Sequence, residues 1–222
     1  MVVGVLATLV VWAIVSSQER ISSLAVRGFL NGVNVDAGDA SITVVRGGDR
    51  VGVGVRRTDH YTFGHDARVS RSVVDGVLRL RSRCPSTVLH TCSADFRLIV
   101  PDNVPITVAT GSGAVNFIGY RGTARVTTGS GDINLGGFCG NSLEATAGTG
   151  DIDADTSCAT QQLSLRSRSG AVHARVPPGR YRVEADSDAG HVAIRGLTRE
   201  DGSPFRVQAL SGSGDVMVEA NR

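Results

Sequence analysis

The sequence predicts an all-β fold, and more specifically a single-stranded β-solenoid with two stacked sheets and about 18–20 residues per coil. Three observations predict it. Glycine is abundant, at 28 residues, while aromatic residues make up only 5% of the chain, a balance typical of tight turns and thin layers. A turn followed by an alternating strand recurs from Pro105 onward, and aliphatic residues return at the same positions in every copy.

The first element is an apolar run from Val2 to Val15, which carries no charge and is followed by polar residues. It is shorter than the roughly 20 residues that span a bilayer, and no Arg or Lys precedes it. The sequence therefore favours a signal anchor whose start lies upstream of Met1 over a cleaved signal peptide. We expect a short apolar membrane helix over residues 1–17, followed by a linker over 18–32.

Residues 33–104 have β-like segments without a regular repeat. We expect them to form an N-terminal capping region, because the end of a solenoid exposes unpaired strand edges. The stretch 57–72 is expected to be an edge loop or an irregular strand. The candidate strands of the capping region are Val33–Val35, Ser41–Val45, Val51–Val55, Val77–Leu80 and Phe96–Val100.

Residues 105–222 carry the regular repeat, in which a small turn precedes a short strand; the turn is Gly-x-Gly in four copies, and only its last glycine is kept in the copies at Gly170 and Gly190. The aligned glycines of the six turns are Gly113, Gly131, Gly150, Gly170, Gly190 and Gly214, so the intervals are 18, 19, 20, 20 and 24 residues. One such unit cannot bury its apolar face alone, so we expect the coils to stack in sequence order. The last, longest interval contains a wide turn from Thr198 to Pro204.

Two columns of aliphatic residues define the predicted core. The column two residues after the glycine contains Val115, Ile133, Ile152, Val172, Val192 and Val216. The column seven residues before it contains Ile106, Ala124, Leu143, Leu163, Val183 and Val207. Their direct neighbours are mostly polar and should face solvent, because side chains in a strand alternate between its two faces.

The four cysteines suggest two disulfides. Cys139 and Cys158 each lie eight residues after a turn glycine, so they share one column on adjacent coils at the spacing of a disulfide. Cys84 and Cys92 bracket a short segment and suggest a local bridge. An even number of cysteines behind a membrane segment favours disulfides, and so an oxidising compartment. The alternative is a four-cysteine zinc site, but the C-x-x-C spacing of such sites is missing.

The chain resembles the putative-adhesin family of β-strand-repeat proteins, a domain of unknown function common in high-GC Gram-positive bacteria and related to toast-rack domains of envelope-stress proteins. The resemblance rests on the membrane segment, the strand 77–82 leading to Cys84, the strand from Cys92 to Val100, and the Thr-Gly-Ser-Gly-Asp turns. It spans about Val33 to Val218. It implies a membrane-anchored solenoid on the outer face of the cell and supplies no catalytic residues.

Composition excludes several chemistries. All 23 basic residues other than His are Arg, so the chain cannot form a Walker-type phosphate loop or a lysine Schiff base. A net charge of only +2, without a basic stripe, argues against a nucleic-acid partner. Each Gly-rich turn precedes a short strand rather than a helix, so no dinucleotide cofactor is expected.

The turn aspartates leave one metal alternative open. Asp132 and Asp151 should stack on an exposed face with Asp153 beside them, where a calcium ion could relieve their repulsion. The other interpretation is that these carboxylates accept hydrogen bonds from nearby backbone amides. Calcium-binding nonapeptide repeats have a period of about nine residues and one residue between Gly and Asp. In this chain the period is about twice as long, and Asp follows Gly directly. His173 and His191 are interpreted as separate surface histidines on adjacent coils.

The function that the sequence favours is a non-enzymatic, adhesin-like binding or scaffold module. Its partner would be a surface ligand, a cell-wall polymer or a membrane partner protein. The expected location is the extracytoplasmic face of the cell membrane, held by a single pass, with secretion as the alternative. Two other functions remain open: an envelope-stress signalling domain, and a polysaccharide-active enzyme using Asp132, Asp151, Asp153 and Arg166.

Overall fold

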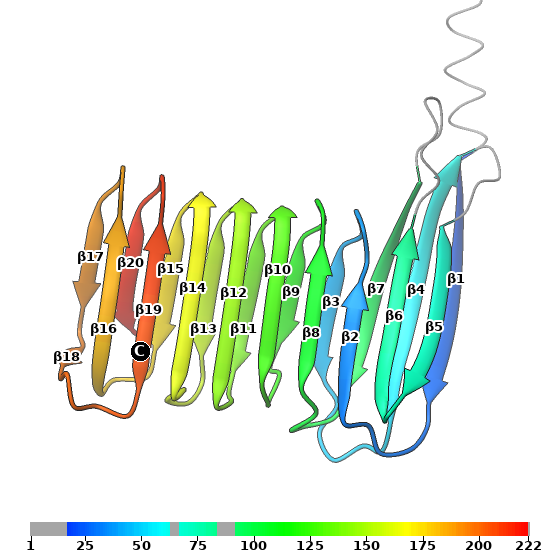
Figure 1. Ribbon diagram of the computed structural model, residues 1–222, viewed down its shortest axis with the longest axis horizontal. Coiled ribbons are helices and arrows are strands. Elements are labelled where there is room, and N and C mark those ends of the chain that lie inside the picture. The colour runs from blue at the N-terminus through cyan, green and yellow to red at the C-terminus, as the bar shows by residue number, and fades with distance from the viewer. Residues whose placement is uncertain (1–16, 63–66, 84–91, 222) are drawn as a thin grey trace, which may run out of the picture.

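The chain folds into two facing β-sheets, and the computed structural model describes residues 17–62, 67–83 and 92–221. Sheet A contains, in spatial order, β1 (Ser17–Val26), β4 (Val53–Thr62), β7 (Cys92–Val100), β3 (Ile42–Arg46), β9 (Val115–Ile118), β11 (Ile133–Phe138), β13 (Ile152–Thr156), β15 (Val172–Val176), β20 (Val216–Ala220) and β17 (Val192–Arg195). Sheet B contains β18 (Thr198–Arg199), β16 (Arg180–Ser187), β19 (Arg206–Ser211), β14 (Gln162–Ser169), β12 (Ser142–Thr149), β10 (Ala124–Ser130), β8 (Ile106–Thr110), β2 (Gly32–Asp36), β6 (Val77–Arg83) and β5 (Arg68–Val74). Figure 1 shows the strands as one long row.

The all-β prediction is confirmed, and each central coil contributes one strand to each sheet. Leu143 pairs with Ala124 on one side and with Leu163 on the other, as the predicted column requires. In the second column Ile133 lies between Val115 and Ile152. All these residues are at most 1% exposed, so the thin core between the sheets is built from the aliphatic columns.

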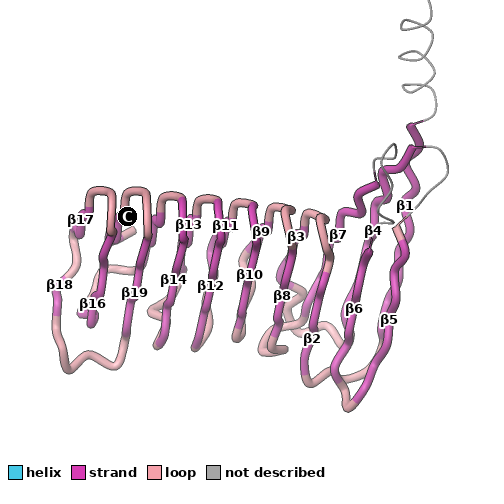
Figure 2. Tube along the Cα trace, turned by 45° about the horizontal axis from the view of Figure 1, so that its top comes forward, coloured by secondary structure: helices cyan, strands magenta, loops and turns pink. Residues whose placement is uncertain are grey.

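The turn glycines allow neighbouring coils to approach closely. A Cβ atom added to Gly131 would lie 2.5 Å from the carbonyl oxygen of Gly113, closer than real Cβ contacts. The same distance separates a Cβ at Gly150 from the Gly131 oxygen. In some coils a serine three residues before the glycine adds a hydrogen bond to this ladder: Ser167 donates to the Gly150 carbonyl at 2.9 Å and Ser211 to the Gly170 carbonyl at 2.8 Å. Figure 2 shows these narrow turns along one edge of the solenoid.

The order of the coils at the C-terminal end differs from the predicted sequence order. Strand β19 lies between β14 and β16, and β20 lies between β15 and β17. Val207 is therefore buried at 1% exposure, whereas Val192 in the last coil is 42% exposed. The ten residues between β17 and β19 are long enough to return the chain past the outer coil.

The N-terminal end shows the same kind of exchange. Strands β2 and β3 pair with β8 and β9 on one side and with β6 and β7 on the other, so they form a regular coil inside the stack. The prediction that all of 33–104 forms a cap was therefore wrong for this part. The end itself is formed by antiparallel pairs, β1–β4–β7 in sheet A and β5–β6 in sheet B.

Two expectations about the first hundred residues need correction. Most of the expected linker over 18–32 is not a linker but part of β1. Every residue of β1 pairs with a residue of β4. The stretch 57–72 supplies regular parts of β4 and β5 rather than an irregular strand, although 63–66 lie outside the described residues. The described part of the chain contains no helix that could cross a bilayer. The predicted membrane helix lies outside this part, apart from Ser17.

Candidate binding surface

The turn aspartates form hydrogen bonds between coils. Asp132 Oδ1 accepts from the backbone N–H of Asp151 at 2.9 Å, and Asp151 Oδ1 accepts from that of Ala171 at 2.8 Å. Asp215, in the turn before β20, makes the same kind of bond, because its Oδ1 accepts from the N–H of His191 in the turn before β17 at 2.8 Å. This backbone hydrogen bond lowers the pKa of Asp215. Each carboxylate thus satisfies an amide in the neighbouring turn.

This geometry does not favour the calcium alternative. Asp132 and Asp151 are each turned toward an amide of the next coil, while Asp153 binds Arg175 Nη2 through its Oδ1 at 2.6 Å. Among the residues that the structure describes, no group of three or more His, Cys, Asp or Glu side chains could hold a metal ion.

The side chains proposed for polysaccharide cleavage are not brought together. Asp132, Asp151 and Asp153 belong to the sheet A side of the turns, whereas Arg166 lies on β14 in sheet B. Arg166 donates through Nη2 to Gln208 Oε1 at 2.7 Å on that opposite sheet. The four residues therefore do not form one catalytic cluster.

A charged network that the sequence analysis did not predict lies on the outer face of sheet A. His173 lies 2.9 Å from Glu219 through its Nε2 and 3.6 Å from Asp153 through its Nδ1. Arg175 completes it through its ion pair with Asp153. The four side chains come from β13, β15 and β20, and their exposed fractions of 27–39% leave them open to a ligand. We call Asp153, His173, Arg175 and Glu219 the acid–base row.

The interpretation of His173 as an isolated surface histidine was wrong. His173 and His191 also do not lie on adjacent coils, because β20 separates β15 from β17. A column comparison could have placed His173 beside Asp153, since both are three residues after a turn glycine. Glu219 could not be found in this way, because its position depends on the exchanged order of the coils.

The outer face of sheet B carries one separate pair and a second connected cluster, in which Gln208 links Glu184 on β16 to Arg166 on β14. Arg125 donates through Nε to Glu144 at 2.9 Å. Arg206 and Gln208 both donate to Glu184, at 2.8 and 2.9 Å. The hydrogen bond from Arg206 is the main reason that the pKa of Glu184 is lowered.

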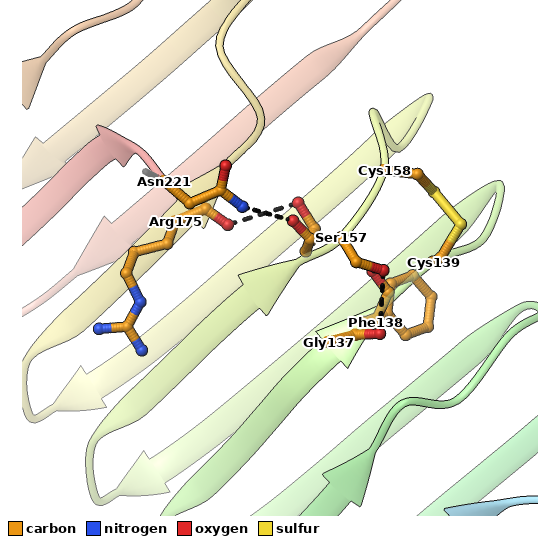
Figure 3. The surroundings of a disulfide bond; sticks show 8 residues. Gly137, Phe138, Cys139, Ser157, Cys158, Arg175 and Asn221 are labelled. Carbon is orange, nitrogen blue, oxygen red and sulfur yellow. Dashed lines mark hydrogen bonds between the residues drawn. A yellow bond between two sulfur atoms is a disulfide. The ribbon is translucent and has the colours of Figure 1, made fainter.

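The disulfide between Cys139 and Cys158 is confirmed, with Cα atoms 5.1 Å apart (Figure 3). It joins adjacent coils just beyond the ends of β11 and β13. Beside it the Ser157 hydroxyl donates to the Gly137 carbonyl at 3.2 Å. The predicted bridge from Cys84 to Cys92 lies outside the described residues, because Cys84 falls in the undescribed segment.

Removing this bridge should lower stability strongly. The bond closes a loop with a sequence separation of 19. A loop of this length is worth about 3 kcal/mol through the entropy of the unfolded chain. We expect Cys139→Ala/Cys158→Ala to lower the Tm by roughly 6–12 °C in thermal unfolding followed by circular dichroism. Dithiothreitol should lower the Tm of the wild type by more than that of the variant, which keeps only the predicted bridge between Cys84 and Cys92; an equal fall in both proteins would contradict this assignment.

The fold and its surfaces define a two-sheet β-solenoid whose regular coils carry charged and polar side chains on both outer faces. Residues 93–222 match the family described as Toastrack DUF4097, and the chain belongs to this family. No curated protein matches the sequence.

Solved structures extend the likeness in fold toward the N-terminus. A putative cell adhesion protein from Clostridium sporogenes is similar with a TM-score of 0.55 at 12% identity, covering 92% of this chain and 100% of its own. Putative adhesins from Bacteroides fragilis and Parabacteroides merdae cover the same 92% of this chain and 97% of their own, at 12% and 11% identity, with TM-scores of 0.38 and 0.36. At this identity the first likeness concerns the fold alone.

Proposed function

We propose that the protein is a non-enzymatic binding module of the cell envelope, which contacts a cell-wall polymer through the acid–base row on sheet A. The observation that carries this proposal is the connection of Asp153, Arg175, His173 and Glu219 across three neighbouring strands. Rigid parallel strands hold these donors and acceptors at intervals of about 4.8 Å. A polymer with regularly spaced hydroxyl or charged groups could bind along such a row.

The proposed location is the extracytoplasmic face of the cell membrane. Two features support it: the apolar run 2–15, and the disulfide between Cys139 and Cys158, a bond typical of oxidising compartments. The name of the similar Clostridium sporogenes protein, a putative cell adhesion protein, agrees with a surface function. Secretion after removal of the apolar run is the alternative location.

The test is binding of the full chain to purified, insoluble cell-wall material in a sedimentation assay. We expect Asp153→Ala/Glu219→Ala to weaken binding about tenfold, because both carboxylates of the row are lost. The matched control is Arg125→Ala/Glu144→Ala, which removes a charged pair from sheet B and should bind like the wild type.

Other outcomes separate the competing functions. Equal binding by both double variants would contradict the assignment to sheet A. Association only with a membrane protein would favour the envelope-stress signalling function. Release of soluble sugar from the cell-wall material by the wild type, lost in Asp132→Asn or Asp151→Asn, would favour the enzyme.

A further inference from the structure

Two arginines face each other near the N-terminal end of sheet A. Arg56 on β4 is directly opposite Arg97 on β7 in an antiparallel pair, and both side chains are exposed. They lie on the outer face, because their neighbours Val55 and Leu98 are buried in the core. Like charges at directly opposed positions destabilise a sheet. A bound anion would offset this cost.

The described residues supply no such anion. Neither Arg56 nor Arg97 forms an ion pair within the ranges that the structure describes, whereas Arg46 binds Asp102 at 2.7 Å. The acid nearest to Arg97 along the strand is Asp95, which accepts from the Ser41 amide and lies 3.5 Å from His60. A bound anionic ligand would supply the negative charge that the described residues do not place here.

A groove of about 390 Å³ adjoins the two arginines. This volume falls within the range of small-molecule sites. Its floor is apolar because Gly54 has no side chain and lies between Ala25 and Ile99 in the ladder. The groove thus combines an apolar floor with two cationic side chains at its border.

The apolar floor continues across the sheet as a row. Ile99 pairs with Val45, which pairs with Ile118, and Ile118 is 51% exposed. Five strands from Ala25 to Ile118 make a row of roughly 19 Å, since adjacent strands lie about 4.8 Å apart. An extended hydrocarbon chain could lie along it.

We propose that this groove binds an anionic phospholipid. Its phosphate would contact Arg56 and Arg97, whose guanidinium groups suit phosphate oxygens, and an acyl chain would cover the apolar row. A bilayer is the proposed source because the apolar run 2–15 precedes β1. The groove lies at the Ala25 end of β1, away from Ser17, so the outer face of sheet A must lie along the membrane surface for the lipid to reach it. This site lies at the opposite end of sheet A from the acid–base row, so it does not rest on the proposed function.

The experiment uses the full chain in nanodiscs that contain a photoactivatable phosphatidylglycerol. Mapping of the cross-links should find lipid attached within β1, β4 and β7. We expect Arg56→Gln/Arg97→Gln to reduce this labelling about tenfold, through the loss of two charge-assisted contacts. Gly54→Val should do the same by filling the groove, because a Cβ at Gly54 meets only ordinary contacts 3.6 Å or more away.

Two matched controls accompany these variants. Gly136→Val adds the same side chain in the same face of sheet A, beside Ile118 at the far end of the apolar row and again with 3.6 Å to the nearest atom. It leaves the groove open and should be labelled at least as strongly as the wild type. Arg168→Gln/Arg182→Gln removes two exposed arginines from sheet B and should also be labelled normally. The Tm values should show that all variants are folded.

Three results would overturn the proposal. One is equal labelling by a phosphatidylcholine probe, which has no net negative charge. Another is labelling of the groove that Arg56→Gln/Arg97→Gln and Gly54→Val leave unchanged. Equal labelling by a long-chain fatty acid probe would assign the groove to a free carboxylate amphiphile instead of a phospholipid.

Discussion

Val207→Asp is expected to destabilise the protein by about 4 kcal/mol, because it buries a carboxylate without a partner. Val207 is 1% exposed, since β19 is enclosed between β14 and β16. For a chain of this size the change corresponds to a Tm lowered by roughly 8–16 °C. Thermal unfolding followed by circular dichroism measures it.

Val183→Asp provides the matched control. Val183 pairs directly with Val207 in the same column, but it belongs to the outer coil and is only partly buried. We expect it to cost about 1 kcal/mol, because its carboxylate can reach water. If the coils stacked in sequence order, Val183 would be enclosed and Val207 terminal. A larger loss for Val183→Asp would therefore refute the exchanged order.

Gly131→Ala should also cause a large loss, of about 3 kcal/mol or a Tm lowered by roughly 6–12 °C. The added methyl group would lie 2.5 Å from the Gly113 oxygen and 2.9 Å from the Gly113 carbonyl carbon. Both contacts are with backbone, so the two coils must separate locally to admit it. Chemical denaturation monitored by circular dichroism gives the free energy of unfolding.

Gly136→Ala lies on β11, the strand that follows the Gly131 turn, and is the control. Its added methyl group would lie 3.6 Å from the nearest atom, which is an ordinary contact. The substitution also restricts the unfolded chain, so stability should stay within about 1 kcal/mol of the wild type or rise. Equal losses in the two variants would show that close approach at the turn is not why glycine recurs there.

The repeat could be predicted from the sequence because its signal is local. Side-chain alternation on each side of a turn glycine shows which residues face the core, and the observed pairing of Leu143 with Leu163 follows that alignment. The same alignment placed Cys139 beside Cys158 correctly. These features depend only on the register between coils that are adjacent in both sequence and space.

The order of the coils could not be predicted in the same way, because every coil presents the same aliphatic columns to its neighbours. Val207 fits against Leu163 as well as Val183 would, so side-chain packing alone does not choose between them. The lengths of the connections between strands carry the remaining information about the order of the coils. Three residues join β15 to β16, whereas ten join β17 to β19, and the longer connection is the one in which the chain returns past the outer coil.

The acid–base row shows how this limit affects a site. Asp153, His173 and Arg175 lie in neighbouring coils of the regular repeat, so column positions could have brought them together. Glu219 joins them because β20 pairs with β15, which the sequence order of coils would not allow. The groove at Gly54 could not be predicted from the sequence either, because the antiparallel strands around it follow no repeat.

The exchanged coils also determine which strands are protected from fraying. Strands β19 and β20 are held on both sides, and the coil outside them, β16 and β17, is synthesised earlier. That outer coil has no complete docking surface until β19 and β20 have been made. Strands β19 and β20 cannot separate from the stack first, because the coil outside them must leave before they do. The outermost coil, rather than the strands that follow it in the sequence, should therefore be the first to open in local unfolding.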